Sequence, residues 1–481
     1  MTPAMIIDGR GVAGDITFDV VNPASGAVFA QAPECSDAQL DESVAAAARA
    51  FPAWSAKVDD RRAALAAAAD RLETRSEEIV TLLTAEQGKP LAMARMELAG
   101  SVGALRALAG AELPREVIQD DAEARVEVVG RPLGVVAAIT PWNFPVVIAI
   151  NKLAPALLTG NTVVLKPSPL TPLATLAMAE VIHEAFPAGV VNVISGGDGL
   201  GARLSGHEGV RKITFTGSIP TGKAIAAAAA GDLKRITLEL GGNDAAILLD
   251  DVDLAAMTEP LFWSSFLNTG QVCAAVKRVY APAGRYDEVV QALAARAAAT
   301  TIGPGDESGV ELGPLQNRRQ LDRVAELVDD AIRSGARCVT GGTRIDRDGF
   351  FYEPTVLAGA ADGMRLVDEE QFGPALPVIA YDRLEDAVAA ANGTRFGLGG
   401  SVWSGDEERA AAAGARLTCG TTWINTHALP LPFAPFGGRD WSGIGVEGGR
   451  WGIEGFVDWH TVYTARSRGA NAEAGFAETV A

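Results

Sequence analysis

The first third of the chain changes from short apolar pieces to long stretches of helix-forming residues. Residues 1–30 have the pattern of brief β-strands separated by glycine and proline. Residues 37 to about 110 are dominated by alanine, leucine, glutamate and arginine, which favour helices. Residues 124–140 are rich in β-forming side chains, and Gly130 and Pro132 predict a turn at their centre.

A different pattern follows, in which apolar segments alternate with glycine or proline turns and with helices. The candidate strands between residues 134 and 250 are GVVAAIT, NTVVLKPS, VVNVISGG, KITFTGS and AAILLDD. The helices between them are TPLATLAMAEVIHEAF and TGKAIAAAAAG. Near-continuous apolar strands that alternate with helices favour a parallel sheet covered on both faces. Ligands of such sheets bind at the carboxyl ends of the strands.

A second α/β region runs from about residue 252 to 424. It contains the expected helices YDEVVQALAARAAA and RRQLDRVAELVDDAIRSGA. Residues 425–466 are rich in glycine, proline and aromatic side chains and end in the strand-like FVDWHTVYTAR. The final SRGANAEAGFAETVA has the composition of a frayed end. A length of 481 residues also predicts two or three domains rather than one core.

Charge and cysteine content narrow the range of functions. The formal net charge of −19 argues against nucleic acid or an anionic membrane as a partner, because both select clustered lysine and arginine. No apolar segment reaches the roughly 20 residues of a membrane helix, and we expect no secretory signal. The cysteines show no metal or disulfide spacing, so we expect a reducing cytoplasm and no metal site. They are Cys35, Cys273, Cys338 and Cys419.

A glycine loop before an alanine-rich helix, TFTGSIPTGKAIA, raises a question about phosphate binding. Gly217, Gly222 and Lys223 have the spacing of a P-loop, but Ala224 stands where serine or threonine would hold magnesium. The segment AILLDD could supply the acidic motif of a nucleoside triphosphatase. The alternative is a turn that places a different phosphate at the amino end of a helix. The loop alone leaves both interpretations open.

Five further segments change this picture. They are TPWNFPVVIAINKLAPALLTGNTVVLKPS at 140–168, RITLELGGNDAAI at 235–247, NTGQVCAA at 268–275, DEEQFGPALPV at 368–378 and PFGGRDWSGIGVEGG at 435–449. In this order they closely resemble the NAD(P)-dependent aldehyde dehydrogenase superfamily, over roughly residues 15–466. In that family the glycine turn belongs to a dinucleotide-binding fold, so the resemblance implies that Lys223 is not a P-loop lysine.

The resemblance implies an α/β fold with a doubly wound Rossmann-type cofactor domain, a second α/β catalytic domain and a small β oligomerisation flap. The expected boundaries are 1–121 and 139–241 for the dinucleotide-binding domain, 242–424 for the catalytic domain with the nucleophile, 122–138 and 455–470 for the flap, and 425–454 for a substrate-loop segment that returns to the cofactor domain. In the family the tail strand adds to a partner's sheet, which implies a homodimer or homotetramer.

The resemblance also implies which residues carry the chemistry. Cys273 matches the nucleophile, whose thiolate forms a covalent adduct with the aldehyde and then a thioester. Glu239 matches the base that activates water against the thioester. The Asn143 amide and the Cys273 N–H match the oxyanion site. Lys152 and Glu447 match positions assigned to proton relay, with a structural ion pair as the alternative.

A nicotinamide cofactor follows from the same resemblance. The implied cofactor residues are Ile139, Thr140, Pro141, Trp142, Lys166, Ser168, Pro169, Thr216, Gly217, Ser218, Leu240, Gly241, Glu370 and Phe372. Many NAD-preferring members carry a glutamate in the place of Pro169, which repels the 2′-phosphate of NADP. This chain lacks that glutamate, but no arginine or extra lysine beside Pro169 attracts the phosphate. We therefore expect NAD and leave NADP open.

The substrate is expected to be a small-molecule aldehyde that meets a mostly apolar wall. The implied wall residues are Ile148, Asn151, Phe266, Leu267, Val272, His427, Leu429 and Leu431. Relatives that oxidise semialdehydes often carry arginine in the place of Asn151, so we expect an aliphatic or aromatic aldehyde that is oxidised to the acid. A CoA-acylating semialdehyde dehydrogenase is the first alternative, although such enzymes usually lack the glutamate seen at Glu239. A P-loop nucleoside triphosphatase is the remote one.

Overall fold

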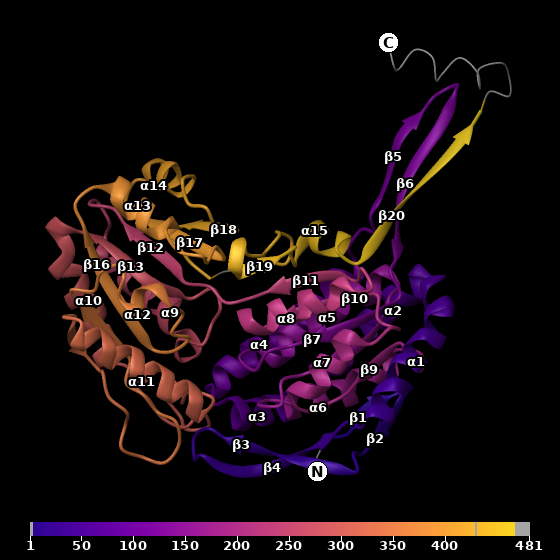
Figure 1. Cartoon of the computed structure of the whole chain (residues 1–481), viewed down its shortest axis with the longest axis horizontal. Coiled ribbons are helices and arrows are strands. Elements are labelled where there is room, and N and C mark those ends of the chain that lie inside the picture. The colour runs from indigo at the N-terminus through magenta and orange to yellow at the C-terminus, as the bar shows by residue number, and fades with distance from the viewer. Residues whose placement is uncertain (1–2, 429–430, 467–481) are drawn as a thin grey trace.

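The computed structural model describes residues 3–428 and 431–466, which form two large sheets, a projecting flap and an amino-terminal hairpin (Figure 1). The hairpin pairs β3 (Ile16–Asn22) with β4 (Ala27–Glu34). Within the described ranges no helix is long and apolar enough to cross a membrane. Parallel strands joined by helices form the centre of both large sheets, as the sequence predicts, and antiparallel strands lie at their edges.

The first sheet is built around five parallel strands, and its order is β19-β11-β10-β7-β8-β9-β1-β2. Its strands are β1 (Met5–Ile7), β2 (Arg10–Val12), β7 (Val135–Ile139), β8 (Thr162–Lys166), β9 (Val191–Val193), β10 (Lys212–Thr216), β11 (Arg235–Glu239) and β19 (Gly443–Ile444). β7 and β8 are buried at every position, as inner strands of a covered sheet should be. Chain order reverses between β7 and β10. Doubly wound sheets bind ligands at the carboxyl ends beside such a switch point.

Helices pack on the first sheet and on one another. They are α1 (Asp37–Ser55), α2 (Val58–Thr74), α3 (Ser76–Gln87), α4 (Leu91–Ala109), α5 (Pro145–Thr159), α6 (Leu173–Ile182), η1 (His183–Ala185), α7 (Asp198–Gly206) and α8 (Ile219–Ala230). The first four confirm the helical block expected up to about residue 110. α1 starts with a capping box in which Ser36 and Gln39 satisfy each other's backbone N–H groups.

The second sheet has the order β14-β15-β16-β13-β12-β17-β18. Its strands are β12 (Asp244–Leu248), β13 (Val276–Pro282), β14 (Arg337–Thr340), β15 (Thr355–Ala358), β16 (Ala375–Tyr381), β17 (Gly399–Trp403) and β18 (Thr421–Ile424). Its helices are α9 (Leu254–Phe266), η2 (Leu267–Gly270), η3 (Ala283–Arg285), α10 (Tyr286–Ala298), α11 (Arg318–Arg333), α12 (Arg365–Asp368), α13 (Leu384–Asn392) and α14 (Glu407–Gly414). The segment AAILLDD therefore does not continue the first sheet, because β12 pairs with β13 and β17.

Three antiparallel strands form the flap, which projects from the body (Figure 1). They are β5 (Arg115–Asp120), β6 (Ala124–Pro132) and β20 (Val457–Ala465). The turn predicted at Gly130 and Pro132 is wrong, since both residues lie inside β6 and pair with β20. The chain breaks instead at Gly134, whose φ of 127° suits glycine. The partner strand lies more than 300 residues away, so local sequence could not indicate that β6 runs on.

The segment before β20 returns to the first sheet. It contains η4 (Asp440–Ser442), β19 and α15 (Gly449–Glu454). β19 pairs with β11, next to the end of that strand at Glu239. The late glycine-rich motif thus lies beside the carboxyl end of β11, although the two are about 200 residues apart in sequence.

Candidate active site

Cys273, the candidate nucleophile, follows a sharp bend between α9 and β13. The bend is η2, in which Asn268 and Thr269 hold left-handed φ angles of 51° and 58°. Such backbone strain gathers at functional sites in proteins. Burial raises the pKa of the Cys273 thiol to about 12, and the Glu239 carboxylate adds to the effect. The thiol therefore lies within electrostatic reach of the candidate base and depends on nearby donors or cations to ionise.

Asn143 reaches the nucleophile loop from the first sheet. It lies between β7 and α5 and is 3 % exposed. Its Nδ2 donates to the backbone carbonyl of Gln271, two residues before Cys273, at 2.9 Å. A side-chain amide has two N–H hydrogens, so one is left to bind an oxyanion. This contact brings together two predicted catalytic positions that are 130 residues apart in sequence.

Glu239 is the last residue of β11 and is 5 % exposed. Within the described residues neither carboxylate oxygen has a hydrogen-bond partner. Burial raises the pKa of Glu239 well above the usual carboxyl value; Glu447 adds to this rise and Lys152 opposes it. A carboxylate in this environment is suited to accept a proton near neutral pH.

Lys152 and Glu447 form an ion pair close to Glu239. The Lys152 side chain is fully buried on α5 and also donates to the Thr214 hydroxyl at 3.2 Å. Glu447 keeps 17 % of its side chain exposed, so the pair lies between the buried base and solvent. A further buried cation, Lys212, starts β10, and burial followed by the charge of Lys152 lowers its pKa to about 7.

The predicted cofactor residues gather at the switch point. Residues 139–142 begin at the end of β7, Lys166 ends β8, and Thr216 ends β10. The hydroxyls of Thr140 and Thr216 are buried, and neither has a hydrogen-bond partner in the described part of the chain. Burial lowers the pKa of Lys166 to about 8, while Asp198 acts in the opposite direction. Free polar groups and a lysine thus converge where a doubly wound sheet binds its ligand.

The glycine loop leads directly into the amino end of α8. Gly217 precedes Ser218, whose hydroxyl caps this 12-residue helix by accepting the Thr221 N–H at 3.4 Å. Backbone N–H groups at such a helix end attract phosphates. On the neighbouring loop Ser168 and Pro169 follow Lys166 without adding a charge of their own.

Glu370 and Phe372 approach this edge from the second sheet. Glu370 accepts the backbone N–H of Gly242 at 3.1 Å, and burial raises its pKa to about 7. A side chain at Gly241 would collide with that carboxylate, so only glycine permits the approach. The ring of Phe372 lies edge-on to Trp142 at 5.3 Å. Leu240, in contrast, packs against Gly222 of α8.

Comparison with known proteins identifies this arrangement. A family model described as the aldehyde dehydrogenase family matches residues 12–462. The chain belongs to the aldehyde dehydrogenase family. It is 40 % identical over 465 residues to the 3-sulfolactaldehyde dehydrogenase of Pseudomonas putida, which covers 94 % of this chain and 95 % of that protein. It is 37 % identical over 447 residues to the succinate-semialdehyde dehydrogenase (NADP(+)) of Escherichia coli, which covers 92 % and 93 %.

A solved structure supports the same conclusion. The NAD+ complex of the aldehyde dehydrogenase from Bacillus cereus matches with a TM-score of 0.94 and 34 % identity, over 97 % of each chain. The resemblance drawn from the motifs and the predicted fold class are therefore confirmed. The individual roles of the site residues stay predictions, which the geometry described above supports.

The predicted substrate wall of this aldehyde dehydrogenase is only partly assembled. Ile148 and Asn151 lie on α5, Leu267 and Val272 flank the nucleophile bend, and Leu431 is exposed. Leu429 falls outside the described residues. Phe266 is 1 % exposed and stacks on Phe262 at 4.9 Å in the core of the second sheet. The place of Phe266 at the substrate wall stays a prediction.

His427 occupies a more specific place than the sequence indicates. Its side chain is fully buried, and Nε2 lies 3.4 Å from the Asp244 carboxylate, outside hydrogen-bond geometry. The ring also packs on Trp423 with centroids 4.7 Å apart. Asn425 and Ala428, on either side, have left-handed φ angles of 54° and 55°. The backbone thus takes two costly conformations to bring an imidazole beside a buried carboxylate.

Several buried polar residues at the site are not indicated by the sequence motifs. Lys89 donates to the backbone carbonyl of Asn143 at 2.8 Å and pairs with Glu97. Asn268 donates to the same carbonyl at 3.1 Å. Lys277 donates to the Gly270 carbonyl at 2.6 Å. In the sequence, Lys89 stands in a Gly-Lys-Pro segment after a helix. This segment is only a weak indication of a buried lysine, since loop lysines are usually exposed.

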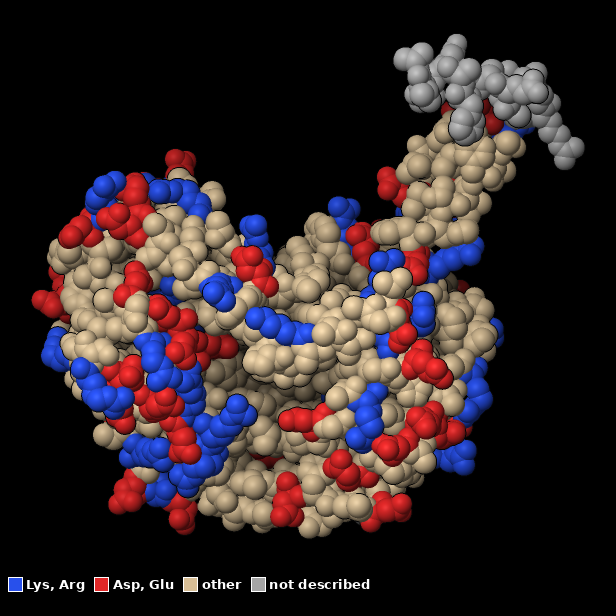
Figure 2. Space-filling model, in the orientation of Figure 1, with Lys and Arg blue, Asp and Glu red and all other residues tan. Residues whose placement is uncertain are grey.

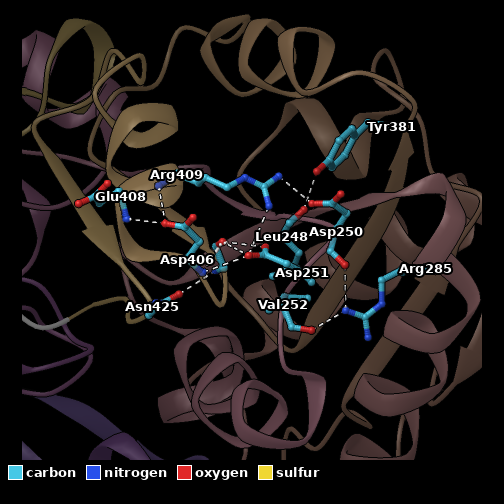
Figure 3. Close-up of polar contacts among 11 residues, drawn as sticks. Leu248, Asp250, Asp251, Val252, Arg285, Tyr381, Asp406, Glu408, Arg409 and Asn425 are labelled. Atoms are coloured by element: carbon cyan, nitrogen blue, oxygen red, sulfur yellow. Dashed lines mark hydrogen bonds and ion pairs between the residues drawn. The ribbon is translucent and has the colours of Figure 1, made fainter.

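The P-loop alternative fails on geometry as well as on family. Lys223 is exposed on α8, and its Nζ lies 3.8 Å from the centre of the Trp441 ring. Asp250 and Asp251 follow β12 in the other sheet, where they bind Arg409 and Ser404 (Figure 3). A P-loop and its acidic partner must face one magnesium ion. Among the described residues no group of three His, Cys, Asp or Glu could hold a metal ion.

Proposed function

We propose that this chain oxidises an aldehyde to a carboxylic acid, with Cys273 as the nucleophile and Glu239 as the base. The observation that carries the proposal is the Asn143–Gln271 hydrogen bond of 2.9 Å, which joins the oxyanion amide to the nucleophile loop. Glu239 is buried nearby, and its negative charge raises the pKa of the Cys273 thiol. A thiol, an amide donor and a raised-pKa carboxyl are the three groups that the chemistry needs.

The chain's own residues account for the sequence of bond changes. The Cys273 thiolate adds to the carbonyl carbon, and the resulting oxyanion is bound by the Asn143 amide. The carbonyl reforms as hydride leaves the carbon, so that a thioester remains on Cys273. Glu239 then takes a proton from water, whose oxygen attacks the thioester carbon. The carbon–sulfur bond breaks, and the acid and the Cys273 thiolate are released. Lys152 and Glu447 carry that proton toward solvent.

The residues at the switch point fit an NAD(P) cofactor, which supplies the hydride acceptor when bound. Support comes from the amino end of α8 and from the Thr140 and Thr216 hydroxyls, which have no hydrogen-bond partner among the described residues. We favour NAD over NADP because Asp198 and Glu34, whose charges raise the pKa of Lys166 against the effect of burial, would also repel a 2′-phosphate. Initial rates with both cofactors test the choice, and a higher kcat/KM with NADP would reject it.

The catalytic assignment is tested with two cysteine variants. Cys273→Ala should abolish NADH formation from any aldehyde while cofactor binding, followed by tryptophan fluorescence, is retained. Cys338→Ala, a partly buried thiol on β14, is the matched control and should keep the original rate. Full turnover by Cys273→Ala would remove Cys273 as the nucleophile.

We propose an aliphatic or aromatic aldehyde as the substrate, since Asn151 takes the place of a carboxylate-binding arginine. The relatives named above act, by their names, on 3-sulfolactaldehyde and succinate semialdehyde, so both anionic aldehydes belong in the substrate panel. We expect the highest kcat/KM for uncharged aldehydes. A clear preference for short dicarboxylic semialdehydes would overturn this part of the proposal.

Water rather than coenzyme A is proposed to resolve the thioester. The buried carboxyl of Glu239 supports this choice. It has no hydrogen-bond partner among the residues that the structure describes, so it is available to activate water. Free acid should therefore form at full rate in the absence of coenzyme A. A strict requirement for coenzyme A, with an acyl-CoA product, would favour the acylating alternative. A reducing compartment such as the cytoplasm suits a chain whose four cysteines are all free thiols.

We propose that a second copy of the chain covers the flap and completes a homodimer or homotetramer. β20 and β18 lie at open edges of their sheets, where a further strand can pair. On the face drawn in Figure 2 the stem of the flap shows mostly uncharged side chains, and the surface is hollowed between the flap and the lobe of the second sheet. Its exposed apolar side chains are Val117, Ile118, Trp459, Val462 and Tyr463. Such patches mark interaction sites.

Light scattering tests the assembly directly. Trp459→Asp with Val462→Asp should reduce the mass to that of a monomer. Ile16→Asp is the matched control, because Ile16 is 69 % exposed on the amino-terminal hairpin. A monomeric unmodified chain would refute the assembly and leave the proposed reaction standing.

A further inference from the structure

A buried lysine–glutamate pair lies directly behind the oxyanion amide. Lys89 stands between α3 and α4, and Glu97 lies two turns into α4. Both side chains have no exposed surface, and Nζ and Oε2 are 2.5 Å apart. Lys89 Nζ also donates to the Asn143 carbonyl at 2.8 Å and lies 3.9 Å from the centre of the Phe144 ring. Buried ion pairs are costly unless every group is satisfied, so a pair this deep calls for a reason.

The other half of the pair holds the helix that Asn143 precedes. Glu97 Oε1 accepts the N–H groups of Val146 at 2.9 Å and Val147 at 3.2 Å, in the first turn of α5. A carboxylate at this place satisfies donors that the helix cannot pair itself. The pair therefore hydrogen-bonds the backbone at two places: Lys89 at Asn143, and Glu97 three residues later at Val146.

Asn143 is also held from the side of the nucleophile. Asn268 donates to its carbonyl at 3.1 Å, and its own amide donates to the Gln271 carbonyl at 2.9 Å. Asn268 makes this contact from a left-handed conformation. The carbonyl of Asn143 thus receives one donor from each side, Lys89 and Asn268. Together these contacts fix where the free amide N–H points.

We propose that Lys89 and Glu97 are positioning residues that fix the Asn143 amide for oxyanion binding. The inference rests on the proposed function, because it assigns Asn143 to the oxyanion. Donors in such a site act by being placed in advance, and a displacement of about 1 Å costs about 100-fold in rate. Without Lys89 the Asn143 carbonyl keeps one side-chain donor, and Glu97 becomes a buried carboxylate without a cation. The amide then loses its fixed direction.

The test compares Lys89→Met and Glu97→Gln with Glu86→Gln. Glu86 is the matched control, because it is equally buried and accepts the first N–H groups of another helix, α6, from Leu173 and Ala174 at 2.7 and 2.8 Å. We expect Lys89→Met to lower the acylation rate, read as the NADH burst at saturating aldehyde, by about 10- to 100-fold. KM and cofactor affinity should stay within about twofold. Glu86→Gln should lower only the melting temperature.

Two further variants keep the proposal falsifiable if Lys89→Met folds poorly. Lys89→Arg preserves the cation and should recover most of the burst rate. The double change Lys89→Met with Glu97→Gln removes both charges but keeps an oxygen acceptor for the Val146 and Val147 N–H groups, so we expect stability to return and the rate to stay low. A rate that recovers together with stability would overturn the positioning role.

A double-mutant cycle separates this inference from the proposed function. Asn143→Ala alone should slow acylation, and adding Lys89→Met to it should cost nothing further, since the amide to be positioned is gone. An equal additional loss in the Asn143→Ala background would show that Lys89 acts elsewhere. An Asn143→Ala enzyme with the original burst rate would instead refute the assigned oxyanion site, whatever the Lys89 variants do.

Discussion

Two lysine–glutamate pairs contact α5, and they differ in how far their side chains are buried and hydrogen-bonded. Lys89 and Glu97 form a closed group, in which the lysine contacts a carboxylate and a carbonyl and the glutamate accepts two backbone N–H groups. Lys152 and Glu447 form an open one, because Glu447 keeps 17 % of its side chain exposed. Beside the open pair lies Glu239, with no hydrogen-bond partner among the described residues.

The difference separates positioning from proton transfer. In the closed pair both side chains are fully buried and each also hydrogen-bonds the backbone, so this pair suits a fixed scaffold. Beside the open pair, the buried Glu239 carboxyl has no hydrogen-bond partner in the described part of the chain, which is costly for stability. Such a cost is accepted where a proton must be gained and lost. We therefore expect changes in the open pair to alter pH dependence and changes in the closed pair to alter stability and acylation.

Glu239→Gln should have the largest effect of the changes at the open pair. The amide cannot take a proton from water, so acylation and one burst of NADH should proceed while steady-state turnover falls by about 100- to 10,000-fold. Stopped-flow absorbance separates the burst from turnover. A normal steady-state rate in Glu239→Gln would show that Glu239 is not the base. The open pair beside it would then have no proton to transfer.

Lys89→Met should cost more stability than Lys152→Met. Removing one partner of a closed buried pair leaves an uncompensated charge and costs about 3–5 kcal/mol. Glu447 is partly solvated, so the loss of Lys152 should cost clearly less. The midpoints of urea unfolding, followed by tryptophan fluorescence, compare the two variants. Equal losses would mean that the two pairs are alike in energy despite their different contacts.

Much of the fold could be predicted from local sequence. The helical block of α1–α4 and the apolar strands β7 and β8 follow from composition and periodicity, which depend on neighbouring residues. The extent of β6 could not, because its partner β20 comes from the end of the chain. Similarly, the stacking of Phe266 on Phe262 in the core of the second sheet depends on how α9 packs, which local sequence does not give.

The site shows the same division. Cys273, Glu239 and Asn143 could be proposed because each stands within a motif, even though the hydrogen bond that joins two of their segments spans 128 residues. Lys89 and Glu97 stand in no such motif. A lysine after a helix and a glutamate within one are usually solvated, and only the packing of α4 against α5 buries them. Residues that act through another residue's backbone leave little trace in sequence.

Lys152→Met should shift the pH dependence of turnover. The Lys152 cation lowers the pKa of Glu239, which burial and Glu447 raise, so its removal should raise that pKa further. The base is then protonated over a wider range, and the acidic limb of kcat should move up by about one pH unit. Burial lowers the pKa of Lys212 to about 7, so this lysine titrates in the same pH range. Lys212→Met is therefore the control that separates its contribution from that of Glu239. An unmoved limb would make Lys152 purely structural.

Glu447→Gln should give the smallest effect and the opposite sign. The Glu447 carboxylate raises the pKa of Glu239, so replacing it with a neutral amide should lower that pKa and move the acidic limb down. The shift should be less than about one pH unit, because solvent screens a side chain that is 17 % exposed. Glu97 is not among the charges that shift the pKa of Glu239. In Glu97→Gln the acidic limb of kcat should therefore stay in place, while the NADH burst becomes slower. Opposite shifts of the acidic limb in Glu447→Gln and Lys152→Met, with no shift in Glu97→Gln, would establish that the open pair sets the pKa of the base and the closed pair positions the amide. A shift in the same direction in all three variants would show that both pairs act only through the stability of the fold.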